Sequence, residues 1–201
     1  MEAKKMKVVL TKVLLVFTIA LTCIIIAPHE ANASVIKGFN FQAGDIVVTK
    51  STLAKGLTGH AGIVLPDGSN IVHIAGPNTH AVEISISRWL NDYPETKVVR
   101  PNDYFSGMGA SYFGQNYFLN GAGKNIDYSI LSGLSSKNKM YCSKLVWQCY
   151  DGAGINFKVM NVDSSGTRIN YITPAILSPY SFVNARNLDH NGFKLVKSFN
   201  W

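Results

Sequence analysis

The sequence predicts an α+β domain in which a small antiparallel sheet packs against a few helices. Short segments rich in Val and Ile, separated by turn residues, fill residues 39–101. Apolar residues with helical spacing follow Cys142. The chain contains no internal repeat and no low-complexity tail. Together these features indicate one hydrophobic core, which the length of the chain is sufficient to build.

The first 33 residues are predicted to be a secretory signal peptide. Three lysines lie within MEAKKMK, an uncharged apolar run extends from Val13 to Ala27, and small residues at Ala31 and Ala33 precede the cleavage site. The apolar run is shorter than the ~20 residues that span a bilayer, which disfavours a permanent anchor, so we expect no stable membrane span after cleavage. Residues 34–201 are then a single domain of a secreted, extracellular or cell-wall-associated protein.

The charge of this domain excludes one class of partner. Residues 34–201 carry 15 Lys and Arg and 10 Asp and Glu, a net charge of +5, without a run of like charges. Nucleic-acid binding requires a concentrated basic patch, so no nucleic-acid partner is expected. A mild positive charge favours weak attraction to anionic wall polymers or lipid head groups. No feature of the sequence specifies an oligomeric state.

Five strands are predicted before residue 102. They share a high content of Val and Ile, and turn signals such as LPDGSN and AGPNTH separate them. The predicted strands are GDIVVTK (44–50), HAGIVL (60–65), NIVHIA (70–75), AVEISI (81–86) and KVVRP (97–101).

The second half of the chain predicts the helices. A Tyr-, Phe-, Gly- and Ala-rich segment over 104–119 forms the first, and a loop follows over 121–129. A helix from about Cys142 to Tyr150 ends at the glycines that follow it. ITPAILSPY (172–180) predicts a short helix with Thr173 as its cap and Pro174 in its first turn, and FKLVKSF (193–199) predicts a closing strand.

Two cysteines remain in the domain, Cys142 and Cys149. A disulfide between them is disfavoured because seven residues along a helix separate two Cα atoms by about 10.5 Å, whereas a disulfide requires roughly 4.4 to 6.8 Å. The bridge remains possible only if the helix prediction is wrong. Cys149 lies within the apolar stretch and is expected to be a small core residue. Cys142 lies at the helix start, where unpaired N–H groups and the helix dipole favour the thiolate. The alternative is that both thiols are merely buried.

A histidine pair provides the base that a nucleophilic cysteine needs. If Asp67 and Gly68 form a two-residue turn, Gly62 lies opposite His73, and His60 is the diagonal neighbour of His73 on the same face. His60 is then the candidate base and His73 the group that orients it. The alternative is two half-exposed histidines on an ordinary hairpin.

A zinc site built from His60, His73 and His80 is disfavoured because these residues lack helical i, i+4 spacing and His80 follows a GPNT loop. No metal or organic cofactor is therefore expected. His190 is expected to be exposed in a turn. Asp45 and Asp127 are expected to act as a turn cap and in a structural hydrogen bond.

The ordered motifs GDIVVT, GHAGIVL, RW, VVRP, IDYS and YCSKLVWQCY resemble the NlpC-type papain-like cysteine hydrolases, specifically their circularly permuted YiiX/YebB-like branch. His60 precedes Cys142, which is the permuted order. The resemblance covers about residues 41–179 and implies a papain-like fold with Cys142 as the nucleophile, His60 as the base and His73 as the third polar member. The permuted branch often has an acidic residue at that third position, where this chain has histidine.

The sequence and the resemblance together predict an exported thiol hydrolase that cleaves amide bonds in cell-wall peptides through a thioester at Cys142. The N–H of Cys142 would help to bind the oxyanion. Two alternatives remain. Permuted relatives include enzymes that move acyl groups on lipids, and the aromatic segment 103–118 could line an apolar pocket, although core packing also explains it. The other alternative is a non-catalytic module that binds an acyl chain or a wall peptide.

Overall fold

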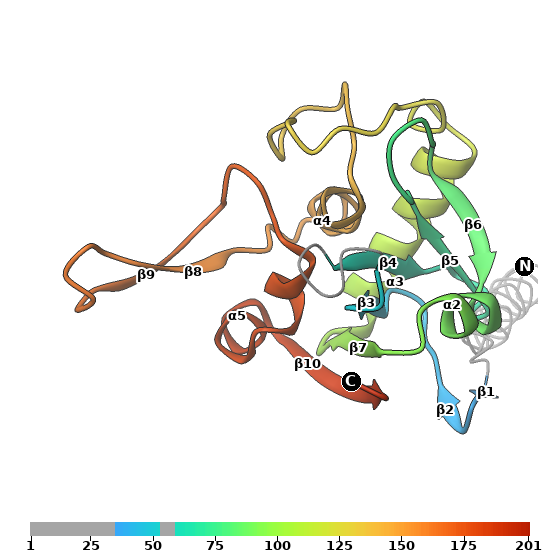
Figure 1. The fold of residues 1–201 in the computed structure, drawn as a ribbon, viewed down its shortest axis with the longest axis horizontal. Helices are drawn as coiled ribbons and strands as arrows, with labels where there is room; N and C mark the ends of the chain where they lie inside the picture. Colours follow the sequence, from blue (N-terminus) through green and yellow to red (C-terminus); the bar gives the residue numbers. More distant parts are fainter. Residues whose placement is uncertain (1–34, 53–58) are drawn as a thin grey trace, which may run out of the picture. The chain divides into compact units, whose positions relative to one another are not determined.

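A six-stranded antiparallel sheet forms the centre of the described chain (Figure 1). The structure is a computed structural model and describes residues 35–52 and 59–201, so the predicted signal peptide lies outside the described residues. All the predicted strands are present, which confirms the α+β fold class. In their order across the sheet the strands are β10 (Phe193–Phe199), β7 (Thr96–Pro101), β3 (Ile46–Thr49), β4 (His60–Val64), β5 (Asn70–His73) and β6 (Val82–Ser85).

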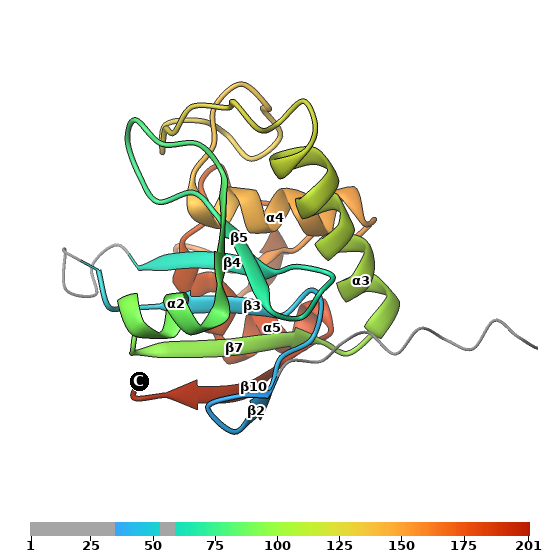
Figure 2. The same ribbon diagram turned by 90° about the vertical axis from the view of Figure 1, so that its right-hand side faces the viewer.

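The central strands β3 and β4 are buried on both faces, whereas the edge strands β6 and β10 are more exposed. Along β3, Ile46 belongs to the same core cluster as Leu145 of helix α4 (Cys142–Gly152). The next residue, Val47, belongs to a second cluster with Trp89 of helix α2 (Ile86–Asp92). Because successive side chains of a strand point to opposite faces, α4 and α2 cover opposite sides of the sheet (Figure 2).

The helix predicted over 104–119 is present as two consecutive segments. Helix α3 (Tyr104–Phe113) begins at Asp103, whose side chain accepts a hydrogen bond from the N–H of Ser106. The π-helical segment η1 (Gly114–Leu119) continues it. Both pack against α4. Phe118 is buried in the core and Phe113 and Tyr117 pack against it, as one of the two interpretations predicted. Tyr104, Phe105 and Tyr112, in contrast, are exposed.

The helix predicted over 172–180 is wrong. Strand β9 (Ile169–Ile172) ends where this segment begins, residues 173–178 are irregular with a bend at residues 175–176, and only a 3-10 helix, η2 (Pro179–Val183), follows. Pro179 restricts the residue before it to extended conformations, so too few residues remain to form a stable α-helix. The hydroxyl of Thr173 donates a hydrogen bond to Oδ1 of Asn156 (2.8 Å) and caps no helix.

Several short elements were not predicted. Helix α2 begins after Ser85, and helix α5 begins after Asn184, and each of these residues caps its helix with its side chain. The ribbon of β8 and β9 extends away from the sheet (Figure 1). Among the described residues, no helix combines the length and apolar character needed to cross a bilayer. The remaining bounds are β1 (Val35–Ile36), β2 (Phe39–Asn40), β8 (Val159–Val162), β9 (Ile169–Ile172) and α5 (Ala185–Asn191).

Candidate active site

The β4–β5 hairpin brings His60 and His73 together. Ile63 pairs with Val72 in the ladder, which places Gly62 opposite His73 and confirms the predicted register. Nε2 of His60 lies 2.8 Å from Nδ1 of His73, a hydrogen bond between two buried rings. The second nitrogen of His60, Nδ1, is therefore available for another partner.

Gly62 provides the space that this pair requires. A Cβ atom at this position would lie 2.6 Å from Cγ2 of Ile71 and 3.3 Å from Cβ of His73. Carbon atoms in contact are normally about 3.5 to 4.0 Å apart. A side chain at residue 62 would therefore push β5, and His73 with it, away from β4.

Helix α2 supplies aromatic side chains that pack against the ring of His60. The ring of His60 stacks on Trp89, with centroids 5.2 Å apart and planes 19° apart, and Tyr93 lies 5.4 Å away. The indole N–H of Trp89 donates to Oγ1 of Thr96 (3.1 Å), which fixes the orientation of the indole. This contact is not predicted from the sequence, although Trp89 belongs to RW, one of the motifs that carry the family resemblance.

Both histidines are neutral in the folded chain near pH 7. Burial, and secondarily the charge of His73, lower the pKa of His60 to about 3. Burial and the positive charge of Arg88 lower the pKa of His73 to about 4, against a smaller opposite effect of Asp92. One neutral ring donates and the other accepts in the hydrogen bond that joins them.

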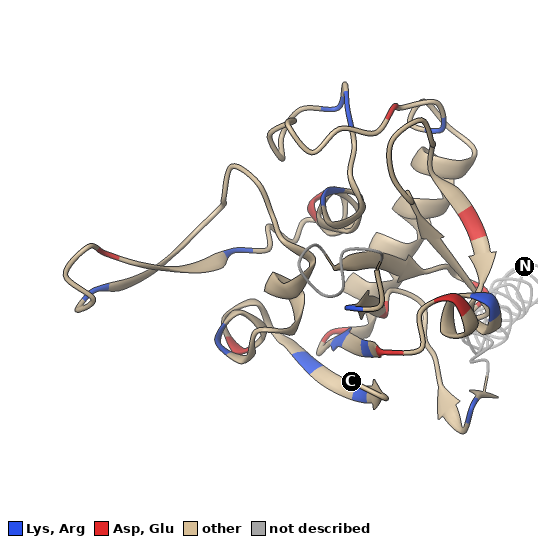
Figure 3. Ribbon diagram, in the orientation of Figure 1, with Lys and Arg blue, Asp and Glu red and all other residues tan. Residues whose placement is uncertain are grey.

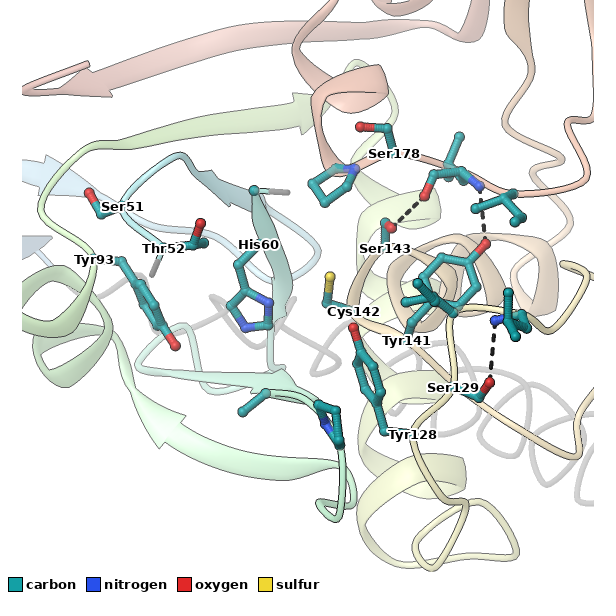
Figure 4. A pocket seen from close by; sticks show the side chains of 18 of the residues that line it. Ser51, Thr52, His60, Tyr93, Tyr128, Ser129, Tyr141, Cys142, Ser143 and Ser178 are labelled. Carbon is teal, nitrogen blue, oxygen red and sulfur yellow. Dashed lines mark hydrogen bonds between the residues drawn. The ribbon is translucent and has the colours of Figure 1, made fainter. Parts of the chain in front are cut away.

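Cys142 is the first residue of α4 and faces the histidine strand. Its thiol is close enough to the backbone N–H groups of Ala61, the residue after His60, and of Ser143 for both to stabilise the thiolate. Figure 4 shows the Cys142 sulfur beside the His60 ring. The structure therefore brings all three predicted site residues together, with His73 behind His60.

The helix start does not make Cys142 acidic, contrary to the prediction. Burial raises the pKa of the Cys142 thiol, and this effect outweighs the lowering by the nearby N–H groups. Cys142 is 7% exposed, and the backbone of Leu177 is held against the start of the helix. The hydroxyl of Ser143 donates to the carbonyl oxygen of Leu177 (2.7 Å), and the N–H of Leu177 donates to Oη of Tyr141 (3.0 Å). The resting pair is a neutral thiol beside a neutral imidazole.

Cys149 is the core cysteine that the sequence predicted. Its side chain is fully buried, and burial raises its pKa strongly. Cys149 and Cys142 are both free thiols, so the disulfide alternative is wrong.

A cavity of about 1420 Å³ opens beside Cys142 and His60. One wall consists of Tyr128, Ile130 and Leu131 from the loop before α4. Ile176 and Leu177 contribute a second apolar wall, whereas hydroxyl side chains of Ser and Thr residues supply polar groups at other positions. The hydroxyl of Tyr128 points toward Cys142 (Figure 4). The cavity thus brings the Cys142 thiol, the His60 imidazole and the Tyr128 hydroxyl together with a largely apolar interior.

Two polar side chains of α4 hold the loop that forms the first wall. Nζ of the buried Lys144 donates to Oγ of Ser132 (2.7 Å) and to the carbonyl oxygen of Lys139 (2.8 Å). Burial lowers the pKa of Lys144 to about 8. One helical turn later, Nε2 of Gln148 donates to the carbonyl oxygens of Leu134 (2.9 Å) and of residue 136 (3.0 Å). The wall is therefore attached to the nucleophile helix.

The other polar residues named from the sequence lie apart from this centre. The carboxylate of Asp45 forms a bidentate ion pair with Arg100, with both distances 2.7 Å, and accepts a hydrogen bond from the N–H of Gln42. Asp127 pairs with Lys139 at 2.6 Å and lies 3.9 Å from His80. These contacts are structural, as predicted.

His190 is exposed, as predicted, and stacks on Tyr171. It lies in the last turn of helix α5 and not in a loop turn, so that part of the prediction is wrong. Among the residues that the structure describes, no group of three or more His, Cys, Asp or Glu side chains could hold a metal ion.

Comparisons with known proteins agree with this architecture. In fold, the chain is similar to the crystal structure of the metalloprotein YiiX from Escherichia coli O157:H7, with a TM-score of 0.56, 16% identity, and coverage of 80% of this chain and 98% of that one. The similarity shows a papain-like fold. An uncharacterised 30.3 kDa protein of Bacillus thuringiensis is 36% identical over 128 residues, which cover 58% of this chain. The match spans 47% of that relative, about half its length.

The family comparison covers nearly the whole sequence. The model of the family described as lipoprotein N-acylation protein LnsA-like matches residues 4–199. The match includes both strands of the histidine hairpin and the helix that carries Cys142. The chain belongs to the LnsA-like family of lipoprotein N-acylation proteins.

Proposed function

We propose that this protein is a thiol acyltransferase that carries an acyl group on Cys142 and transfers it to an amine. The observation that carries the proposal is the large apolar cavity that ends at Cys142 and His60. A long hydrocarbon chain fits such a cavity better than a polar peptide does. Membership of a lipoprotein-related family indicates an envelope-associated protein, and we further propose that residues 1–33 are the signal peptide that directs residues 34–201 there.

The first step forms a thioester. The sulfur of Cys142 attacks the carbonyl carbon of an ester donor, and Nδ1 of His60 accepts the thiol proton. Because both groups are neutral at rest, proton transfer accompanies the attack. The C–O bond of the ester then breaks, and His60 returns the proton to the leaving alcohol. His73 acts as a positioning residue that holds the His60 ring through the hydrogen bond to Nε2.

The tetrahedral intermediate carries a negatively charged oxygen, which hydrogen-bond donors must stabilise. The backbone N–H of Cys142 at the start of α4 is one candidate, as proposed from the sequence. The hydroxyl of Tyr128 is a second, because it points toward the same place from the opposite wall (Figure 4). Removing one such donor typically lowers kcat by about 10² to 10³.

The second step transfers the acyl group to the acceptor. A neutral amine attacks the thioester carbonyl and forms a C–N bond, His60 accepts the amine proton, and the C–S bond breaks. The proton then returns to sulfur and regenerates the Cys142 thiol. The family description points to the amine of a lipoprotein as the acceptor.

A second candidate function is cleavage of amide bonds in cell-wall peptides by the same Cys142–His60–His73 set, with water as the acceptor. The hydroxyl side chains in the cavity, including Ser51 and Ser178, favour it because they offer hydrogen bonds to a peptide. The permuted NlpC-type relationship proposed from the motif order would accommodate either chemistry. A module that only binds acyl chains or wall peptides is the third possibility.

Intact-mass measurement separates these functions. The full chain is incubated with dioleoyl phosphatidylglycerol or with a wall tetrapeptide, and the mass and the cleavage products are recorded. We expect an oleoyl adduct that hydroxylamine removes, that is lost in Cys142→Ala and that is retained in the matched variant Cys149→Ala. Addition of an amine-bearing diacylglyceryl peptide should discharge the adduct as an amide. Cleavage of the tetrapeptide without an adduct would support the peptidase instead, and neither product would support the binding module.

A further inference from the structure

Three apolar side chains surround the mouth of the cavity and face solvent. Leu131 is 86% exposed, and Ile130 and Ile176 are each 54% exposed. They come from two segments distant in sequence, the loop before α4 and the chain before η2, and all three also line the cavity. We call these three residues the apolar rim.

We propose that the apolar rim is a docking surface for an anionic lipid bilayer, through which an acyl chain passes from the membrane into the cavity. This inference rests on the proposed acyl transfer and names the physical source of its donor. Exposed apolar side chains that are continuous with an apolar cavity remove the water gap that a hydrocarbon chain would otherwise cross.

Hydrogen bonds with four polar side chains fix the two segments that carry the rim. On one side Lys144 and Gln148 bind main-chain and side-chain oxygens of the loop that follows Leu131. On the other side Ser143 and Tyr141 hold the backbone of Leu177, the neighbour of Ile176. Because all four side chains come from α4 or its cap, both halves of the rim have a fixed position relative to Cys142.

The charge around the rim fits an anionic surface. The segment 121–139, which contributes Ile130 and Leu131, carries three lysines and one acidic residue, Asp127. Asp127 pairs with Lys139, so Lys124 and Lys137 supply the excess positive charge of the segment. Figure 3 shows these basic positions along the loop. The segment 173–183, which contributes Ile176, has no charged residue. Apolar side chains flanked by lysines are typical of surfaces that bind the interface of anionic membranes.

A pair of tryptophan variants tests the contact directly in the full chain. Leu131→Trp places a probe on the rim, and Phe105→Trp places one at a matched position, because Phe105 is 79% exposed on α3 and lines no part of this cavity. Vesicles of phosphatidylglycerol with brominated acyl chains quench tryptophans that enter the bilayer. We expect strong additional quenching for Leu131→Trp and none for Phe105→Trp, with weaker quenching in brominated phosphatidylcholine.

Equal quenching of the two variants would overturn the proposal. A second result would also overturn it. If Leu131→Trp were dimeric and its tryptophan emission were blue-shifted in the absence of vesicles, the rim would be an interface between two copies of the chain.

A rate measurement separates this inference from the proposed function. Acylation of Cys142 is compared for a vesicle-borne diacyl lipid and for a soluble acetyl ester. Leu131→Ser should lower the ratio of the two rates by about tenfold, the factor expected from one leucine side chain leaving the membrane, whereas Phe105→Ser should leave it unchanged. An unchanged ratio in Leu131→Ser would refute the docking surface alone. Failure of wild-type protein to acylate with either donor would refute the acyltransferase, and the quenching result would still decide the docking.

Discussion

Replacing Gly62 by alanine tests whether the spacing of β4 and β5 controls the histidine pair. The added Cβ would lie 2.6 Å from Cγ2 of Ile71, 3.1 Å from the carbonyl oxygen of Val72 and 3.3 Å from Cβ of His73. All three atoms belong to β5. The strand must therefore move outward, because β4 is held on its other side by β3.

The size of the effect follows from these distances. Relieving the 2.6 Å contact requires a shift of about 1 Å toward ordinary carbon–carbon separation. Overpacking of this kind costs about 1 to 3 kcal/mol in the free energy of unfolding. The same shift lengthens the 2.8 Å hydrogen bond between His60 and His73 beyond the normal range. A misplacement of about 1 Å in a catalytic group can lower a rate by about 10².

The assay measures stability and chemistry separately. Urea unfolding reports the free energy of unfolding, and mass spectrometry reports the rate of Cys142 acylation by a soluble ester. Gly76→Ala is the matched control, since no atom lies within 4 Å of a Cβ placed there and Gly76 has no positive φ. The control should be neutral or slightly stabilising. If Gly62→Ala had the stability and the acylation rate of the wild-type protein, the close approach of β4 and β5 would not be what holds His60 and His73 in hydrogen-bonding distance.

The charge states of the site and one buried ion pair give three further predictions. Alkylation of Cys142 by iodoacetamide, located by peptide mapping, should keep rising with pH through the ordinary thiol range because burial raises the thiol pKa. A plateau between about pH 4 and 7 would instead reveal a thiolate–imidazolium pair. The folded-state pKa values of His60 and His73, about 3 and 4, lie below the ordinary value of 6.5, so the unfolded chain binds more protons in acid. The free energy of unfolding should therefore fall from pH 6.5 toward pH 4, and urea titrations should show a smaller fall in His73→Gln; an equal fall would contradict the assignment. Arg100→Met should destabilise the fold by about 3 to 5 kcal/mol, because it leaves the buried Asp45 carboxylate unpaired. Adding Asp45→Asn should recover much of this loss, and no recovery would mean that packing of the arginine stem dominates.

The strands were predictable because their signals are local. Runs of Val and Ile bounded by turn residues identify five strands of the six-stranded sheet, and the segment FKLVKSF, in which apolar and polar residues alternate imperfectly, is the sixth. The β4–β5 register followed from its turn, where Gly68 has a positive φ and Asp67 accepts hydrogen bonds from the N–H groups of Ser69 and Asn70. His60 and His73 belong to that one hairpin, so their pairing could be derived without the rest of the fold.

The walls of the cavity could not be derived in this way. Ile130, Leu131 and Ile176 lie in segments with no helical or strand periodicity, and only the folded chain brings the segments together. The helix predicted over 172–180 concealed the second wall, because the prediction took Thr173 as a cap and did not weigh the restriction that Pro179 imposes on Ser178.

The protonation of Cys142 was misjudged for a related reason. The sequence shows a helix start, which stabilises a thiolate. It does not show that the thiol at this helix start is buried in the folded chain. Local and tertiary contributions have opposite signs here, and the tertiary one is larger.

The buried, solitary state of Cys142 also bears on how the protein tolerates oxidants outside the cytoplasm, where we propose that it works. Peroxides attack the thiolate, and the raised pKa of Cys142 keeps that form scarce at neutral pH. Once a sulfenic acid has formed, residues 35–52 and 59–201 offer it no resolving thiol, because Cys149 is fully enclosed two helical turns away. Within this part of the chain, the lifetime of the oxidised protein is therefore set by small thiols or reductases in its surroundings rather than by Cys149.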